Sequence, residues 1–302
     1  MNKLSPELTA RINALNHRRT LHAVKLRPRL QALPAIRAVL FDVYGTLVDS
    51  GAGPLKIGAM EALKRRMAGI LRKAGINLCC LQAGASTLSA WREKILIAHQ
   101  VAGMNGIRHP EMDVRKIWRQ VLRLGIQRGW IRGAVNTGVI TRIALEFEGV
   151  QNPVTLMPGI KEALALLKKR GIKMGIISNA QFYTPLILQT LLDASLSELG
   201  FDRSLCIWSY RLGRAKPSPD LLKTALERAG KKYGLKPREV LMIGNDWNND
   251  LAAARRFGCR TALLAGSQRS FPHLADALRG RKPDLLLTSW AQLECVWTKR
   301  TA

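Results

Sequence analysis

Asp42 is the residue of this sequence best placed to do chemistry. It follows a short apolar run, Ala38 to Phe41, and it precedes the turn residues Val43-Tyr44-Gly45-Thr46. The run shows no period-2 alternation, which is typical of a strand that is buried on both faces. A carboxylate at the end of such a strand costs stability unless it is paired or bound to a metal. The sequence therefore favours a functional Asp42 over a solvated residue at a strand end.

Three later segments also place polar residues directly after apolar runs or in short loops. Ser178-Asn179 ends GIISNA, Lys216 lies in RAKPSPD, and IGNDWNND places Asp246 and Asp250 four residues apart. Residues i and i+4 in the first turn of a helix share a face, so both carboxylates can point at one site. Taken singly, Ser178 fits a turn former, Lys216 a surface lysine and Asp250 a helix-terminal acid.

These segments lie in a region where apolar and helical patterns alternate. Strands are expected at 38–42, 174–177, 205–208, 240–243, 261–264 and 285–287, and helices at 159–169, 219–229 and 249–257. The alternation predicts an α/β fold with a doubly wound parallel sheet. Ligands of such sheets bind beyond the carboxyl ends of the strands, where Asp42, Ser178, Asn179, Asp246 and Asp250 are expected to gather.

The sequence predicts three parts along the chain. Residues 36–50 and 155–302 form the α/β core, and residues 51–154 form an all-helical insertion. Helices of the insertion are expected at 58–73, 86–101 and 137–147, with another that Asp113 caps at its N-terminus. Residues 1–35 form a basic extension with a helix from Pro6 to about Asn16. The sequence does not decide whether this extension packs on the core or binds a partner.

The net charge of +27, from 48 Lys and Arg against 21 acids, is the outlying feature of the composition. Such a field attracts nucleic acid, anionic membrane surfaces or phosphorylated metabolites. The charges lie opposite apolar stripes, as on any solvated helix, and no dense basic block with interleaved aromatics is present. The charge therefore indicates an anionic partner without selecting its class.

Localisation signals are few. No apolar run reaches the ~18 residues that span a bilayer, and the first residues lack the apolar segment of a secretory signal. The five cysteines are scattered and form no metal-ligand pairs with histidines. They predict reduced thiols in a cytoplasmic protein.

The four polar segments, in this order, resemble the haloacid dehalogenase (HAD) superfamily of hydrolases over about residues 36–297. The resemblance implies a HAD-like α/β core with a helical cap inserted after the first motif. It implies that Asp42 is a nucleophile that forms an aspartyl intermediate, which water then cleaves. It also implies Mg²⁺ held by Asp42, Asp246, Asp250 and the main-chain carbonyl of Tyr44.

The same resemblance implies an anion-binding role for Ser178 and Lys216, together with main-chain N–H groups around Val43 and Asn179. Ser178 and Lys216 are thus expected catalytic residues beside Asp42. The expected substrate contacts are Tyr44, Ser178, Asn179 and Lys216.

Two departures from the family pattern point in opposite directions. Phosphatases of the family carry a second Asp two residues after the nucleophile, which protonates the leaving group, and Tyr44 stands there. A phenol with an ordinary pKa of ~10 is a poor general acid at neutral pH, and the DxYGTLxD form resembles the dehalogenase branch. Dehalogenases, however, need no metal, whereas Asp246 and Asp250 indicate a magnesium site. Because Asn245 stands at the usual first acid of that motif, Asp246 is expected to replace it by a one-residue shift.

The sequence thus predicts a Mg²⁺-dependent phosphatase that acts on a small anionic substrate. The first alternative is a 2-haloacid dehalogenase, which Tyr44 favours. The second is a nucleic-acid-binding or scaffolding protein on the same fold with little catalysis, which the charge of +27 supports. The cost of burying Asp42, Asp246, Asp250 and Lys216 without a function opposes that alternative. Any nucleic-acid binding is expected to be weak and independent of sequence, and the oligomeric state is not indicated.

Overall fold

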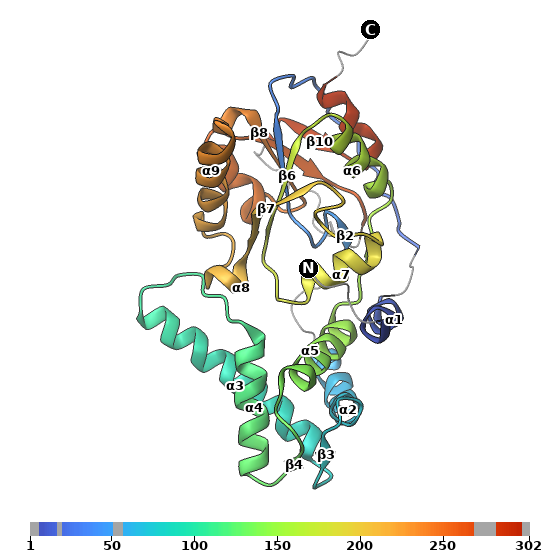
Figure 1. Ribbon diagram of the computed structural model, residues 1–302, viewed down its shortest axis with the longest axis vertical. Coiled ribbons are helices and arrows are strands. Elements are labelled where there is room, and N and C mark those ends of the chain that lie inside the picture. The colour runs from blue at the N-terminus through green and yellow to red at the C-terminus, as the bar shows by residue number, and fades with distance from the viewer. Residues whose placement is uncertain (1–5, 17–19, 51–56, 269–281, 298–302) are drawn as a thin grey trace.

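The chain forms an α/β body and a helical body (Figure 1). This computed structural model describes residues 6–16, 20–50, 57–268 and 282–297. Within those ranges, no helix is both long and apolar enough to cross a membrane.

A six-stranded sheet with the order β10-β9-β8-β1-β6-β7 forms the centre of the α/β body. All of its pairings are parallel, which confirms the predicted doubly wound sheet. Its strands are β1 (Ala38–Phe41), β6 (Lys173–Ser178), β7 (Phe201–Trp208), β8 (Val240–Gly244), β9 (Arg260–Leu264) and β10 (Leu285–Leu287). Phe41 pairs with Ile176 of β6 and with Ile243 of β8, so the carboxyl ends of these three strands meet.

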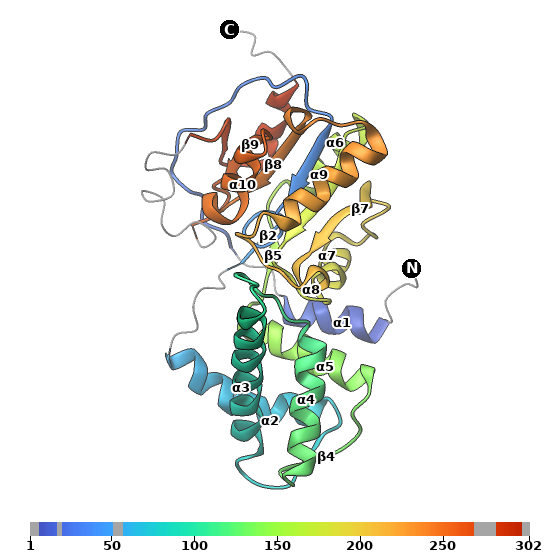
Figure 2. The same cartoon turned by 90° about the vertical axis from the view of Figure 1, so that its left-hand side faces the viewer.

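Helices cover both faces of the sheet. Val39 and Phe41 of β1 pack into the core on one face, and Ala38 and Leu40 into the core on the other, so the strand is buried on both sides. The helices of the α/β body are α6 (Ile160–Lys169), α7 (Thr184–Leu192), α8 (Ser209–Leu212), α9 (Asp220–Tyr233) and α10 (Ala252–Arg256), with the 3₁₀-helices η1 (Pro237–Glu239) and η3 (Trp290–Val296). Figure 2 shows α9 lying across one face of the sheet.

Two helices of the α/β body differ from expectation. The helix expected at 219–229 continues through Gly230 as α9 and ends at Tyr233. Gly234 follows it, and its φ of 64° is the left-handed conformation that commonly closes a helix. The helix expected at 249–257 begins as a π-helical turn, Trp247–Leu251, and continues as α10.

The helical body consists of α2 (Ile57–Lys73), α3 (Ala83–Met104), α4 (Val114–Gln127) and α5 (Thr137–Gln151). A two-stranded antiparallel sheet of β3 (Asn77–Leu78) and β4 (Ile131–Arg132) lies at its far end. Asp113 caps α4 as predicted, because its side chain accepts a hydrogen bond from Arg115 N at 3.0 Å. Trp118 lies at the centre and packs on Trp91 and Phe147. The body is inserted between β2 (Val48–Asp49) and β5 (Thr155–Leu156), which pair antiparallel.

The N-terminal extension packs on both bodies. Helix α1 (Pro6–Leu15) contacts α5 and α7, and Arg11 forms a two-pronged ion pair with Glu146 of α5. Further on, Arg29 pairs antiparallel with Leu286 at the edge strand β10, and Leu33 N donates to Val296 O at 2.7 Å. The described part of the extension therefore packs on the molecule, which the sequence had left open.

Candidate active site

A buried charged cluster lies at the carboxyl ends of β1, β6 and β8. Lys216 Nζ lies 2.5 Å from Asp42 Oδ1 and 2.6 Å from Asp250 Oδ1. Ser178 Oγ lies 3.3 Å from Asp42 Oδ1. The exposed fractions of Asp42, Lys216 and Asp250 are 5%, 8% and 3%, and Ser178 is fully buried. Three of the residues expected to gather at this edge, Asp42, Ser178 and Asp250, thus form one contact network with Lys216.

Asn179 fixes the backbone that carries Lys216. Its side-chain oxygen accepts a hydrogen bond from Lys216 N at 2.6 Å, and its Nδ2 donates to Lys216 O at 3.1 Å. Lys216 Nζ also donates to Ile177 O at 3.2 Å. The amide of Asn179 is therefore engaged in holding the lysine, and its expected contact with a phosphate stays a prediction.

The cluster contains two carboxylates and one ammonium group. Burial opposes the charged form of Lys216, but the charges of Asp250 and Asp42 outweigh it and raise the lysine pKa well above its usual value. Burial raises the pKa of Asp250 to about 7, although Lys216 acts in the opposite direction. A further cation beside Asp250 would favour the ionised form of this buried acid.

The predicted metal ligands divide into two groups. Asp42 and Asp250 face each other across Lys216, whereas Asp246 caps the π-helical turn: its Oδ1 accepts from Asn248 N at 2.7 Å and Asn249 N at 3.1 Å. Its Oδ2 accepts from Asn249 Nδ2 at 2.7 Å. Across the parts of the chain that the structure describes, no three His, Cys, Asp or Glu side chains are arranged around a common metal position. The two facing carboxylates are still the oxygen donors that Mg²⁺ prefers, so the donor set fits this ion.

Two glycines allow the side chains of Asp250 and Asn245 to pack closely against the backbone beside the cluster. A Cβ at Gly244 would lie 2.3 Å from Asp250 Oδ2. A Cβ at Gly45, whose φ is 90°, would lie 2.3 Å from the side-chain nitrogen of Asn245. Only glycine fits at both positions without displacing these side chains.

Tyr44 takes part in a second polar group beside the cluster. Its hydroxyl lies 2.8 Å from Thr184 Oγ1. Burial, with the charge of Glu148, raises the pKa of Tyr44 far above its usual value, so this phenol is a weaker proton donor than an ordinary tyrosine. Glu148 of α5 accepts a hydrogen bond from Tyr183 Oη at 2.8 Å, and burial raises its pKa as well. Nothing in the local sequence signals Glu148 or Thr184, because only tertiary packing brings them to Tyr44.

Residues 36–258, well over half of the chain, match the family model of the haloacid dehalogenase-like hydrolases. The chain belongs to this family and is a hydrolase.

The individual proteins and structures that resemble this chain share low sequence identity with it or cover only part of it. The Rhythmically expressed gene 2 protein of Drosophila melanogaster is 35% identical over 109 residues, which cover 36% of this chain and 38% of that protein. A phosphoglycolate phosphatase of Photorhabdus laumondii is 25% identical over 268 residues, or 87% of this chain and 93% of the relative. The crystal structure of a 2-haloacid dehalogenase from Pseudomonas syringae has a TM-score of 0.51 and 21% identity, and it covers 86% of this chain and 97% of that one. At that identity the likeness shows the fold alone.

Proposed function

We propose that this chain is a Mg²⁺-dependent phosphatase that acts on a small phosphorylated substrate, with Asp42 as nucleophile. The observation that carries the proposal is the buried Lys216 between Asp42 and Asp250 at the carboxyl edge of the sheet. A relative named phosphoglycolate phosphatase, aligned over 87% of this chain, supports the same class of reaction. A cytoplasmic location, which the five free cysteines suggest, is part of the proposal.

In the proposed reaction, a carboxylate oxygen of Asp42 attacks the phosphorus of the substrate, and the bond to the leaving oxygen breaks. Water then attacks the aspartyl phosphate, which releases inorganic phosphate and restores the carboxylate. Lys216 and Ser178 already contact Asp42, so they are placed to donate hydrogen bonds to the transferring oxygens.

Asp42 and Asp250 would hold the metal in this proposal. Asp246 and the carbonyl of Tyr44 are further proposed ligands, and Asp246 would join the site only by leaving its capping bonds. Bound Mg²⁺ would offset the repulsion between the substrate phosphate and the attacking carboxylate.

A 2-haloacid dehalogenase is the second candidate, and Tyr44 is the observation that favours it. Attack of Asp42 on carbon would displace a halide ion, which needs no proton, and water would then cleave the resulting ester. The raised pKa of Tyr44 fits a reaction without a general acid at this position.

Release of phosphate and of halide, each measured with and without EDTA, separates the two candidates. We expect phosphate release from small phosphate esters that EDTA abolishes and that added Mg²⁺ restores. Halide release from 2-haloacids that is indifferent to EDTA would overturn the phosphatase in favour of the dehalogenase.

The position of Tyr44 predicts a dependence on the leaving group. Aryl and acyl phosphates, whose leaving groups need little protonation, should turn over faster than alkyl phosphates, and Tyr44→Asp should raise turnover of the alkyl esters by roughly 10-fold or more. Initial rates on matched aryl and alkyl esters measure this, with Tyr44→Phe as the control that adds no acid. Equal rates on both classes, with chemistry limiting, would mean that another residue supplies the proton.

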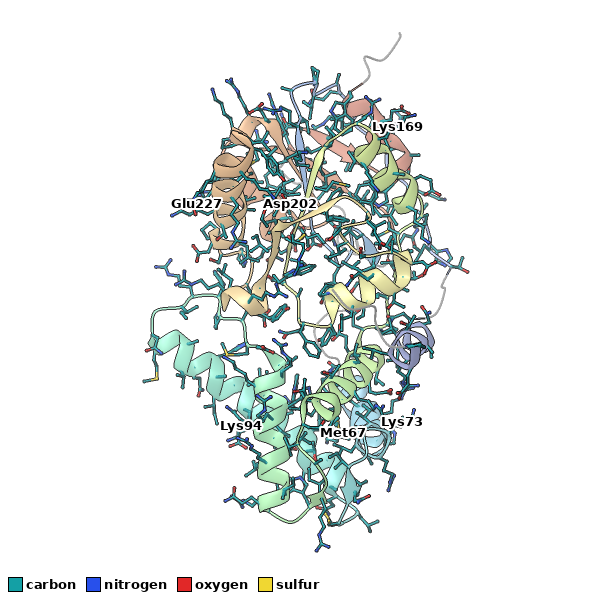
Figure 3. All side chains as sticks on the ribbon, in the orientation of Figure 1. Met67, Lys73, Lys94, Lys169, Asp202 and Glu227 are labelled. Carbon is teal, nitrogen blue, oxygen red and sulfur yellow. The ribbon has the colours of Figure 1, made fainter. Side chains whose placement is uncertain are left out.

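The basic surface predicts only weak binding of nucleic acid. Cationic side chains such as Lys73 on α2 and Lys169 on α6 project from both bodies of the molecule (Figure 3). Such scattered charges make contacts with phosphates alone, so binding should not depend on sequence and should fall steeply between ~50 and ~200 mM salt. Filter binding to duplex and single-stranded DNA and RNA tests this. Tight, sequence-selective binding at the higher salt would favour the binding protein over the enzyme.

A further inference from the structure

The segment between α3 and α4 of the helical body reaches the core beside α8 (Figure 1). Ala215 N donates to His109 O at 2.8 Å, and Glu111 N donates to Gly213 O at 3.2 Å. Pro110 and Arg214 form an antiparallel bridge between these bonds. The segment therefore pairs with the three residues that directly precede Lys216.

Side chains reinforce this pairing. Glu111 Oε1 accepts a hydrogen bond from Gln181 Nε2 at 2.9 Å, and its Oε2 accepts one from Ser209 Oγ at 2.9 Å. Gln181 in turn donates to Met112 O at 2.8 Å and accepts from Val114 N at 3.1 Å. We call residues 109–114 of the helical body, with 180–181, 209 and 213–215 of the core, the clasp.

The clasp contacts two of the loops that build the candidate active site, the one with Asn179 and the one with Lys216. Ser209 Oγ accepts a hydrogen bond from Ala180 N at 2.8 Å, and Ala180 directly follows Asn179. Asn179 holds both the amide and the carbonyl of Lys216. A displacement of Glu111 would thus reach Lys216 by two routes, through Ser209 and Asn179 and through the paired backbone at 213–215.

Glu111 is the central side chain of the clasp. It is a partly buried carboxylate that accepts hydrogen bonds from the core side chains Gln181 and Ser209 and from Met112 N, and burial raises its pKa. Arg115, whose guanidinium lies 5.0 Å from the centre of the Phe182 ring, adds a neighbouring contact that does not depend on Glu111. The helical body would therefore keep part of its contact with the core when Glu111 is changed.

We propose that Glu111 is a positioning residue, which ties the helical body to the core and holds Lys216 in place for the reaction. The catalytic half of this inference rests on the function proposed above, and the structural half does not. A contact that only joined the two bodies would affect stability alone, whereas a positioning contact also affects the Lys216 loop and the chemical step.

The test compares Glu111→Gln with Glu146→Gln. Glu146 is a buried acid of the helical body that pairs with Arg11 away from the cluster. Hydrogen exchange at the Ala215 amide should become at least about tenfold faster in Glu111→Gln, while amides of β8 keep their rate. With a phosphate ester and Mg²⁺, kcat should fall about tenfold and KM should change less. Glu146→Gln should leave the exchange rate of the Ala215 amide and kcat at the wild-type values.

A second variant approaches the same contact from the core. Ser209→Ala removes the donor to Glu111 Oε2, so it should give the same pattern, and its effect should not add to that of Glu111→Gln. Wild-type exchange at Ala215 in both variants, or faster exchange with unchanged kcat, would overturn the positioning role. If the wild-type protein has no phosphatase activity, the proposed function is overturned instead. Hydrogen exchange at the Ala215 amide would still show whether Glu111 and Ser209 hold the clasp together.

Discussion

Asp42→Asn is expected to abolish turnover while the protein stays folded. The amide keeps the shape of the side chain and can still accept a hydrogen bond from Lys216, but it lacks the charge that attacks the substrate. We expect kcat to fall by roughly 10³-fold or more, as for the loss of a nucleophile in other enzymes that use covalent catalysis. Steady-state kinetics with a phosphate ester and Mg²⁺ measure the effect, and circular dichroism confirms the fold.

The matched control for this variant is Asp202→Asn. Asp202 is paired with Lys232 away from the cluster, so its loss should leave kcat within about twofold of the wild type. Retention of about a tenth of the wild-type turnover by Asp42→Asn would remove Asp42 from the mechanism.

Lys216→Met is expected to lower both activity and stability. Methionine has a similar length but no charge, so Asp42 and Asp250 would face each other in a buried site without their shared ammonium group. Breaking a buried ion pair in this way costs about 3–5 kcal/mol of the free energy of unfolding. Loss of a donor to the transferring oxygens should also lower kcat by about 10²–10³-fold. Urea denaturation and steady-state kinetics measure the two effects.

Lys223→Met is the control for the lysine variant, because Lys223 is exposed on α9 and lies 3.9 Å from Glu227. It should change stability by less than about 0.5 kcal/mol. Lys216→Arg keeps the positive charge and is a second test if Lys216→Met does not fold. An unfolding free energy of Lys216→Met equal to that of the wild type would mean that the buried pairing with Asp42 and Asp250 is not formed in solution.

The sequence predicted the parts of the site that depend on strand ends. The run Ala38–Phe41 is apolar at every position because both faces of β1 are buried, and this pattern placed Asp42 at a strand end. Ser178 and Gly244 end β6 and β8 in the same way, so the parallel topology alone brings the loops after these strands together. Lys216 was expected from the family resemblance, and its ammonium group contacts Asp42 and Asp250.

Features that depend on local competition or tertiary contact could not be predicted. The sequence did not show that Asp246 caps the π-helical turn, where the N–H groups of Asn248 and Asn249 compete for its carboxylate. Its place in a site shared with Asp250 stays a prediction. Glu111 lies in a loop without helical or strand periodicity, and its partners Gln181 and Ser209 are 70 and 98 residues further along the chain. Nothing in its local sequence signals those contacts.

The central claim is that Asp42 carries the phosphoryl group during turnover. The most direct measurement is mass spectrometry of peptides after acid quenching of the wild-type enzyme during turnover of an aryl phosphate with Mg²⁺. The account predicts a phosphoryl group on the peptide that contains Asp42, and none on that peptide from Asp42→Asn. Turnover accompanied by a phosphoryl group on a different residue would contradict it.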